Sequence, residues 1–258
     1  MDILILIGII AFLTSLVSGL LGLGGAVLLI PAYLYLPAVL NAPPLDMKSI
    51  SGMTSVQVLS ASLLGMVLHR RKGAVDSRLV LTMGIPITIA AFGGAVFSGT
   101  VQPTALVAVF GCLAVIASIL MVVKKQQPDQ SFTIPVPFNP TGAIAIAVSV
   151  GFFGGMVGAP GAFILSPLMM VALSIPTRVT IGSTLGIVLL SALATSIGKL
   201  ITGQVPVTTT IVAVGSSLPG VYLGSIFSHQ LSTQLLRRVL AVLVSAIGIT
   251  MLYQVFVR

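Results

Sequence analysis

The chain has few charged residues and almost no cysteine. Of its 258 residues, 6% are charged and 57% are hydrophobic, so it lacks the polar side chains that a water-soluble surface requires. Its one cysteine, Cys112, cannot form an intramolecular disulfide, and we expect it to be a small buried hydrophobic side chain. The composition predicts an integral membrane protein, whose apolar runs of roughly 20 residues cross the bilayer as helices.

The chain also lacks the residue sets that catalysis and cofactor binding require. It has no cluster of metal ligands, no paired nucleophile and base, and no phosphate-binding GxxxxGK[ST] loop. We therefore expect neither an enzyme nor a bound cofactor. The four acidic residues are all expected in loops or at the terminus, which leaves no acid inside the membrane to carry a coupling proton: Asp2, Asp46, Asp76 and Asp129.

A glycine-rich pattern occurs twice in the chain. The segment SGLLGLGGAVLLIP (residues 18–31) aligns with GGMVGAPGAFILSP (residues 154–167) at an offset of 136 residues. Further along, the offset is 130 residues and places Gly94 on Gly224. This self-similarity predicts a tandem duplication, with a first repeat (1–124), a polar, proline-rich linker (125–140) and a second repeat (141–258).

Each repeat has an opening apolar segment followed by three ordinary spans. The first opening, residues 3–45, contains no formal charge, and as one straight helix at ~1.5 Å per residue it would run about 65 Å, twice the bilayer core. We therefore predict an all-α polytopic membrane protein with two homologous, inverted repeats, each opening with a helical hairpin broken at glycine and proline. The expected ordinary spans are residues 50–68, 79–99, 104–123, 181–201, 207–228 and 235–257.

The net charge of +8 comes from basic residues in short connectors, where they are topology signals and not a nucleic-acid surface. If each opening segment returns to the side it came from, nine basic residues face one side and three the other; a net crossing gives eight and four. The first arrangement fits the positive-inside rule better and places both termini outside an inner membrane, with the basic loops in the cytoplasm. The nine are Arg70, Arg71, Lys72, Arg78, Lys124, Lys125, Arg178, Arg237 and Arg238.

The broken openings are the predicted substrate site. Backbone that leaves the helix inside a bilayer is tolerated around a cavity or a ligand, and a helix that restarts there directs its positive N-terminal end toward it. We expect restarts near Ala26 and Ala162, facing a small anion at mid-membrane. The AxxxG and GxxxG motifs that end at Gly94 and Gly224 are expected to serve packing alone. The residues predicted to bind substrate are Gly22, Gly24, Gly25, Ala26, Gly158, Pro160, Gly161 and Ala162.

Polar residues near the next helix starts are further candidates for this site: Thr54, Ser55, Gln57, Ser183 and Thr184. Their hydroxyl and amide groups can donate to an anion, but serine and threonine can equally bond carbonyls of their own helix. His69 and Lys199 occupy equivalent positions near helix ends. We expect their side chains to extend to the headgroups, and the alternative is that they line an anion path.

The two glycine-rich openings, each followed by a Gly-x-Thr helix start and a Gly-x-Val loop end, resemble the sulfite exporter TauE/SafE family over nearly the whole chain. The resemblance implies a bacterial or archaeal inner-membrane transporter of sulfite, sulfonates such as sulfoacetate, or related organosulfur anions, usually outward. Ala159 and Pro160 stand where the first opening has Leu23 and Gly24, so the half-sites differ chemically. The motif residues are Gly52 and Thr54, Gly182 and Thr184, Gly73 and Val75, and Gly203 and Val205.

The sequence thus predicts a secondary transporter whose partners are a small anion and the lipid bilayer, with movement of one half against the other to alternate access. Two alternatives remain open. One is a channel-like pore, and the other is a non-transporting membrane partner of a sulfur-metabolism enzyme. A membrane enzyme is the weakest alternative, because the chain offers no catalytic set.

Overall fold

The computed structural model describes residues 2–21, 26–69, 76–123, 136–159, 161, 163–227 and 233–257. Within these residues the regular structure is entirely helical, as predicted. The helices are α1 (Ile3–Leu21), α2 (Ala26–Val39), α3 (Met47–His69), α4 (Ser77–Phe97), α5 (Pro103–Val123), α6 (Pro140–Met156), α7 (Leu165–Ala172), α8 (Thr177–Ile201), α9 (Val207–Phe227) and α10 (Thr233–Val257).

Each opening segment consists of two helices, as its length required. In the first opening, α1 is described as far as Leu21 and α2 from Ala26, and the predicted break between them lies outside the described residues. In the second opening, α6 ends at Met156 and α7 begins at Leu165. The helix therefore restarts later in the chain than the sequence analysis expected, which was near Ala162. Between α6 and α7, Gly158 and Gly161 have φ values of +75° and +69°, which glycine adopts without the steric cost of a side chain.

The six ordinary spans are all present as helices, from α3 to α5 and from α8 to α10. Among the described residues, five helices are long and apolar enough to cross a membrane by length and composition: α1, α4, α5, α8 and α9. Shorter apolar helices cover Ala26–Val39, Pro140–Met156 and Val242–Val255. The outer surface is apolar too, and Ile89 and Ile211 are 70% and 66% exposed, as expected of side chains that contact lipid.

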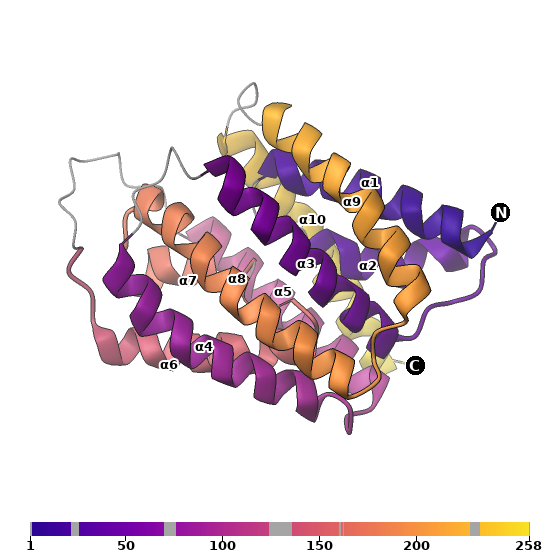
Figure 1. Cartoon of the computed structure of the whole chain (residues 1–258), viewed down its shortest axis with the longest axis horizontal. Helices are drawn as coiled ribbons and strands as arrows, with labels where there is room; N and C mark the ends of the chain where they lie inside the picture. The colour runs from indigo at the N-terminus through magenta and orange to yellow at the C-terminus, as the bar shows by residue number, and fades with distance from the viewer. Residues whose placement is uncertain are drawn as a thin grey trace.

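The helices form two layers (Figure 1). In the first layer α4, α8, α3 and α9 lie side by side, and α6 and α1 cover the two ends of this row by packing on α4 and α9. Behind it lie α2, α5, α7 and α10, with α5 packed on α10. If the predicted duplication is applied, exchanging each helix with its counterpart in the other half gives the same row of contacts in reverse order.

Close helix packing depends on the two glycines at which the AxxxG and GxxxG motifs end. A Cβ atom at Gly94 on α4 would lie 2.0 Å from the carbonyl oxygen of Phe152 on α6. A Cβ atom at Gly224 on α9 would lie 2.2 Å from the carbonyl oxygen of Leu16 on α1. Only glycine lets these backbones approach so closely, so the predicted packing role is confirmed.

The cysteine prediction was wrong, because Cys112 is exposed on the outer surface of α5. In a membrane protein the outward face of a helix contacts lipid tails, so an apolar side chain needs no protein cover there. The local sequence is apolar on all sides and therefore does not reveal which face of α5 points inward.

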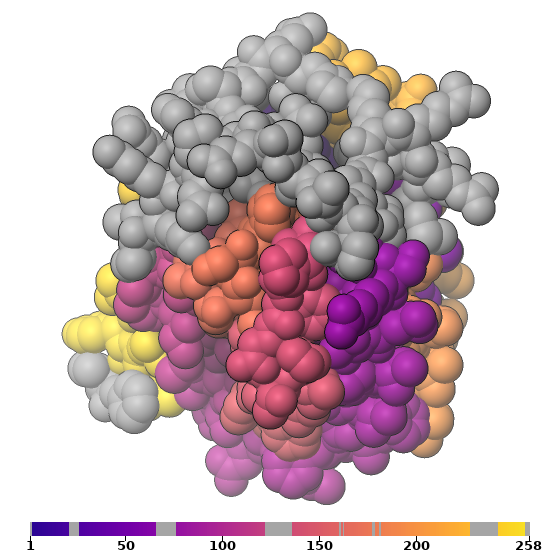
Figure 2. All heavy atoms as spheres, turned by 90° about the vertical axis from the view of Figure 1, so that its left-hand side faces the viewer, coloured from indigo at the N-terminus to yellow at the C-terminus, as the bar shows by residue number. Residues whose placement is uncertain are grey.

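The two ends of the bundle differ in which helices meet there. The beginning of α3, the end of α4, the end of α8 and the beginning of α9 meet at the right-hand side of Figure 1. Figure 2 faces the opposite end, where α4 and α6 begin. At that end Asp76 precedes α4, as expected of a loop residue, but it is 1% exposed. Its carboxylate accepts the N–H groups of Arg78, Leu79 and Val136, and so ties the start of α4 to the segment that enters α6.

Candidate functional site

Lys199, in the last turn of α8, is fully buried, so the expectation that its side chain extends to the headgroups was wrong. Oxygen atoms from four other parts of the chain surround its ammonium group, which therefore needs no water. Lys199 Nζ donates to Ser51 Oγ at 2.8 Å, Ser98 Oγ at 2.6 Å, the Met156 carbonyl oxygen at 2.8 Å and Gln204 Oε1 at 2.9 Å. We call these five residues the Lys199 cluster.

Every hydrogen-bond partner of the Lys199 ammonium is uncharged. The hydroxyl hydrogens of Ser51 and Ser98 point away from it, because these groups donate to the carbonyl oxygens of Lys48 and Ala95. The environment therefore suits a protonated amine, but in the described part of the chain no carboxylate is bonded to it. Positive charge inside a membrane protein is costly, and it marks a place where an anion or another functional partner is expected.

Lys48 adds a second positive charge at the same end of the bundle. It lies at the start of α3, is half-buried, and donates from Nζ to the carbonyl oxygen of Gly99 at 2.7 Å. The region where α3 begins and α8 ends therefore holds two lysines, together with the Asp46 carboxylate, which accepts the backbone N–H of Lys48 at 3.1 Å.

The second break lies directly against the start of α3. A Cβ atom at Gly158 would lie 1.9 Å from the carbonyl oxygen of Ser51, and one at Gly52 would lie 2.2 Å from that of Gln204. These approaches leave no room for a side chain. The structure thus brings together the second break, the start of α3 and the Lys199 ammonium, although these segments are far apart in the sequence.

The remaining predicted residues of the breaks are placed as follows. Gly161 lies inside the second break, where an added Cβ would meet the Ile87 side chain at 3.2 Å. Ala26 is buried at the start of α2. The other five lie outside the described residues: Gly22, Gly24, Gly25, Pro160 and Ala162. Their part in substrate binding stays a prediction.

The predicted hydroxyl donors are engaged within the fold. Thr54 and Ser55 are buried on α3 and donate to the carbonyl oxygens of their own helix, at Ile50 and Gly52. This is the arrangement that serine and threonine commonly adopt inside helices. Each hydroxyl oxygen keeps a free lone pair. Before either hydroxyl could donate to a substrate, however, its hydrogen would have to leave the helix carbonyl.

The two hydroxyl groups predicted as donors on α8 also make hydrogen bonds within the fold. Ser183 Oγ accepts the backbone N–H of Asp76 at 3.2 Å, which joins α8 to the start of α4. Thr184 Oγ1 lies 3.5 Å from Met169 Sδ on α7, to which it donates. Thr54 and Thr184, which the repeat alignment places at equivalent positions, therefore bond to different partners.

Comparison with known proteins supplies the family. A sequence profile described as sulfite exporter TauE/SafE matches residues 7–251. The chain belongs to this family. Probable membrane transporter protein YunE of Bacillus subtilis is 22% identical to it, with 98% of this chain and 97% of that protein covered. A probable membrane transporter protein of Xylella fastidiosa is 27% identical, with 92% of this chain and 90% of that protein covered. No solved structure matches.

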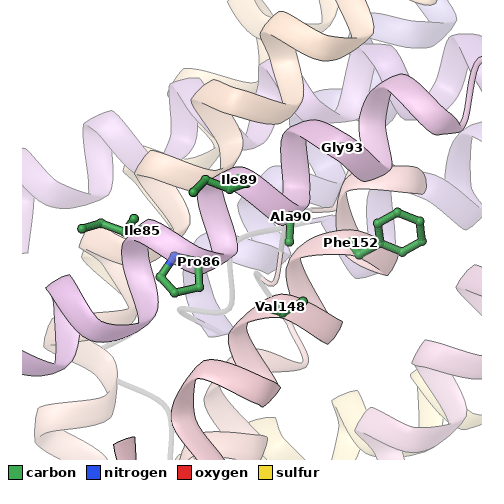
Figure 3. A pocket seen from close by; sticks show the side chains of 7 residues that line it. All are labelled: Ile85, Pro86, Ile89, Ala90, Gly93, Val148 and Phe152. Atoms are coloured by element: carbon green, nitrogen blue, oxygen red, sulfur yellow. The ribbon is translucent and has the colours of Figure 1, made fainter. Parts of the chain in front are cut away.

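The resemblance that the glycine-rich openings indicated is therefore confirmed, and the TauE/SafE chain is a multi-pass membrane transporter. An apolar surface groove of this TauE/SafE protein is lined by no member of the Lys199 cluster (Figure 3). It encloses about 460 Å³ between α4 and α6 and offers no polar side chain to an anion. Its lining residues are Ile85, Pro86, Ile89, Ala90, Gly93, Val148 and Phe152.

Sequence reasoning missed three members of the Lys199 cluster: Ser98, Met156 and Gln204. The sequence feature closest to the cluster was the equivalence of Lys199 and His69 in the repeat alignment. The side chain of His69 lies outside the described residues. Tyr33 was also missed, because it stands in an apolar run of α2 and nothing local distinguishes it from a packing residue. In this TauE/SafE protein the Tyr33 side chain is fully buried.

Proposed function

We propose that the protein is a secondary transporter that moves small sulfur-containing oxyanions, such as sulfite or a sulfonate, across the inner membrane. The observation that carries this proposal is the Lys199 ammonium, a buried positive charge that donates to the Met156 carbonyl at the point where α6 ends and the second break begins. The family description supports a sulfur oxyanion, and the names of the relatives support a membrane transporter.

Binding of an anion is linked to opening of the break in this proposal. The Lys199 ammonium has three hydrogens and four acceptors around it, so a substrate oxygen would compete with these acceptors. Losing the ammonium would free the Met156 carbonyl and with it the end of α6. One half can then move against the other around the bound anion, as in transporters built from inverted repeats.

The predicted residues of both breaks complete the site. In the second repeat Gly158 and Gly161 provide backbone that can turn toward the ligand, because each has a positive φ value. In the first repeat the equivalent positions are Gly22 and Gly25. The helix that restarts at Ala26 would present its free N–H groups and positive dipole end to the same anion.

The membrane potential can drive the transport. With the basic loops in the cytoplasm and the termini outside, an inside-negative potential favours outward movement of each negative charge by about 2.3 kcal/mol per 100 mV. Export of an anion therefore needs no coupling ion. This agrees with the absence of a predicted acid in the membrane-spanning helices of the sequence.

Flux measurements on purified protein test the proposal. Labelled sulfite uptake into proteoliposomes should saturate and be inhibited by sulfoacetate or thiosulfate, with sulfate as a further competitor. Lys199→Met should lower saturable uptake far more than tenfold, because a unit charge about 4 Å from an anion at an effective dielectric constant of ~20 contributes about 4 kcal/mol. Lys199→Gln keeps two N–H donors in the cluster but removes the charge, and should show the same loss if the charge is what matters.

The matched control is Lys48→Met, which removes a positive charge at the same end from a half-buried side chain with one hydrogen-bond partner. It should change uptake by no more than a few-fold, because water and salt screen a partly exposed charge more than a fully buried one. Uptake that does not saturate would favour a pore, and a purified protein that moves no anion would favour a partner subunit. Normal uptake by Lys199→Gln would remove the cluster from the mechanism.

A further inference from the structure

In the first repeat two buried polar side chains lie close together, and one polar atom of each has no hydrogen-bond partner among the described residues. Tyr33 on α2 and Gln57 on α3 are both 0% exposed, and the Gln57 side chain is close enough to the Tyr33 hydroxyl to interact with it. Even so, neither Tyr33 Oη nor Gln57 Oε1 has a hydrogen-bond partner in the described part of the chain. We call these residues the Tyr33–Gln57 pair.

The orientation of the Gln57 amide is set by α9. Gln57 Nε2 donates to the carbonyl oxygen of Ala213 at 3.3 Å. This contact identifies the amide oxygen as the free atom. The pair therefore presents one O–H donor, from Tyr33, and one C=O acceptor, from Gln57.

The pair lies deep in the bundle. Tyr33 is halfway along α2 and Gln57 is halfway along α3, so both are far from either helix end. Unpaired polar atoms at this depth destabilise the fold, because neither water nor backbone is at hand to replace the missing hydrogen bonds. Such atoms in a native structure call for an explanation in terms of function.

The second repeat shows that the fold does not need polar groups here. Under the repeat alignment Tyr33 corresponds to Met169 and Gln57 to Ile187, and both of these side chains are 0% exposed. Met169 Sδ accepts from Thr184 Oγ1, so the equivalent place is filled by apolar side chains with their one polar contact made. The difference between the repeats therefore reflects a task that only the first one performs.

We propose that the Tyr33–Gln57 pair binds a hydroxyl group of the transported anion, and so selects monoanions that carry an O–H, such as hydrogensulfite or a hydroxyalkylsulfonate. This rests on the proposed function. An O–H oxygen can accept from Tyr33 and donate to Gln57 at once, which satisfies both free atoms. A fully deprotonated oxyanion satisfies Tyr33 but places negative oxygen against the Gln57 carbonyl, which leaves that group unpaired.

Two matched sulfonates test this selectivity. Isethionate carries a hydroxyl that ethanesulfonate lacks, and isethionate should inhibit labelled sulfite uptake about tenfold more strongly in the wild type, as expected for one buried hydrogen-bonding group left unpaired. Tyr33→Phe and Gln57→Met should each remove most of this preference. In the hydrogensulfite arm, lowering the pH should lower the half-saturating concentration of total sulfite in the wild type but much less in Tyr33→Phe.

Stability distinguishes a ligand role from a structural one. Tyr33→Phe removes a hydroxyl that makes no hydrogen bond within the described residues, so its melting temperature should not fall below that of the wild type. Ser196→Ala is the control, because Ser196 Oγ is a third buried atom without a partner there, on α8, and its removal should leave the isethionate preference unchanged.

Each outcome decides between the two proposals. Sulfite uptake with equal inhibition by both sulfonates, or an unchanged preference in Tyr33→Phe, overturns the hydroxyl site and leaves the transport function standing. A clear loss of stability in Tyr33→Phe makes the hydroxyl structural and also overturns the site. No uptake, but stronger thermal stabilisation by isethionate than by ethanesulfonate, supports the site and overturns the transport function. Neither uptake nor stabilisation overturns both.

Discussion

Replacing Gly94 by alanine should force α4 away from α6. The added Cβ would lie 2.0 Å from the carbonyl oxygen of Phe152, and a backbone atom cannot rotate out of the way as a side chain can. Ordinary van der Waals contact begins at 3.4 Å, so relieving the clash requires a separation of about 1.4 Å between the two helices.

The whole interface shares this displacement. Gly151 and Gly155 of α6 approach the carbonyl oxygens of Ile87 and Ala91 on α4 in the same way, and their close contacts would open together. Overpacking of this kind costs about 1–3 kcal/mol of the free energy of unfolding. Uptake should fall as well, because α6 leads directly into the second break.

Gly93→Ala is the matched control, one residue away on the same helix. An added Cβ at Gly93 meets nothing within 4 Å, since this position faces the apolar groove. Alanine is the better helix former by up to ~1 kcal/mol in a helix interior, so this variant should be as stable as the wild type or more stable. Denaturant unfolding of both variants in detergent, with sulfite uptake in proteoliposomes, checks the prediction. Equal unfolding midpoints for the two variants would refute the close packing of α4 on α6.

The other predictions concern the break and the ends of the bundle. Gly158→Ala combines a positive φ with a backbone clash, whereas Gly203→Ala has a positive φ and open space, so the first should unfold more easily by about 1–3 kcal/mol in a denaturant titration. Asp76→Ala should lower stability by about 1–2 kcal/mol in the same titration, because it removes the N-cap of α4; an unchanged midpoint would mean that the cap contributes nothing. Gly25→Leu and Gly161→Leu should abolish sulfite uptake while membrane insertion, measured by the amount of protein in the membrane fraction, stays near normal; normal uptake by both would make these glycines packing residues.

Composition and local pattern suffice for the helical class and for most helix positions. The six ordinary spans are recognisable because each is an apolar run of bilayer length bounded by polar or proline-containing connectors, and the helices end within a few residues of the predicted limits. The restart at Leu165 was harder to place, because Gly158 and Gly161 both leave the helical conformation and extend the second break.

The close contact at Gly94 could also be predicted from the sequence, since small residues four apart are a local pattern with a known packing consequence. The helix that packs against this glycine could not be predicted. This helix, α6, lies in the other half of the predicted duplication, and the pairing depends on how the two halves fit together.

The burial of Lys199 and the isolation of Tyr33 and Gln57 belong to the assembled bundle. Lys199 looked like a helix-end lysine because its neighbours in sequence say nothing of Ser51, Ser98 and Met156, which reach it only after separate segments have met. Hydropathy and periodicity describe how one helix behaves in a bilayer. The environment of a buried polar group depends instead on every helix around it, and that is a property of the packed fold.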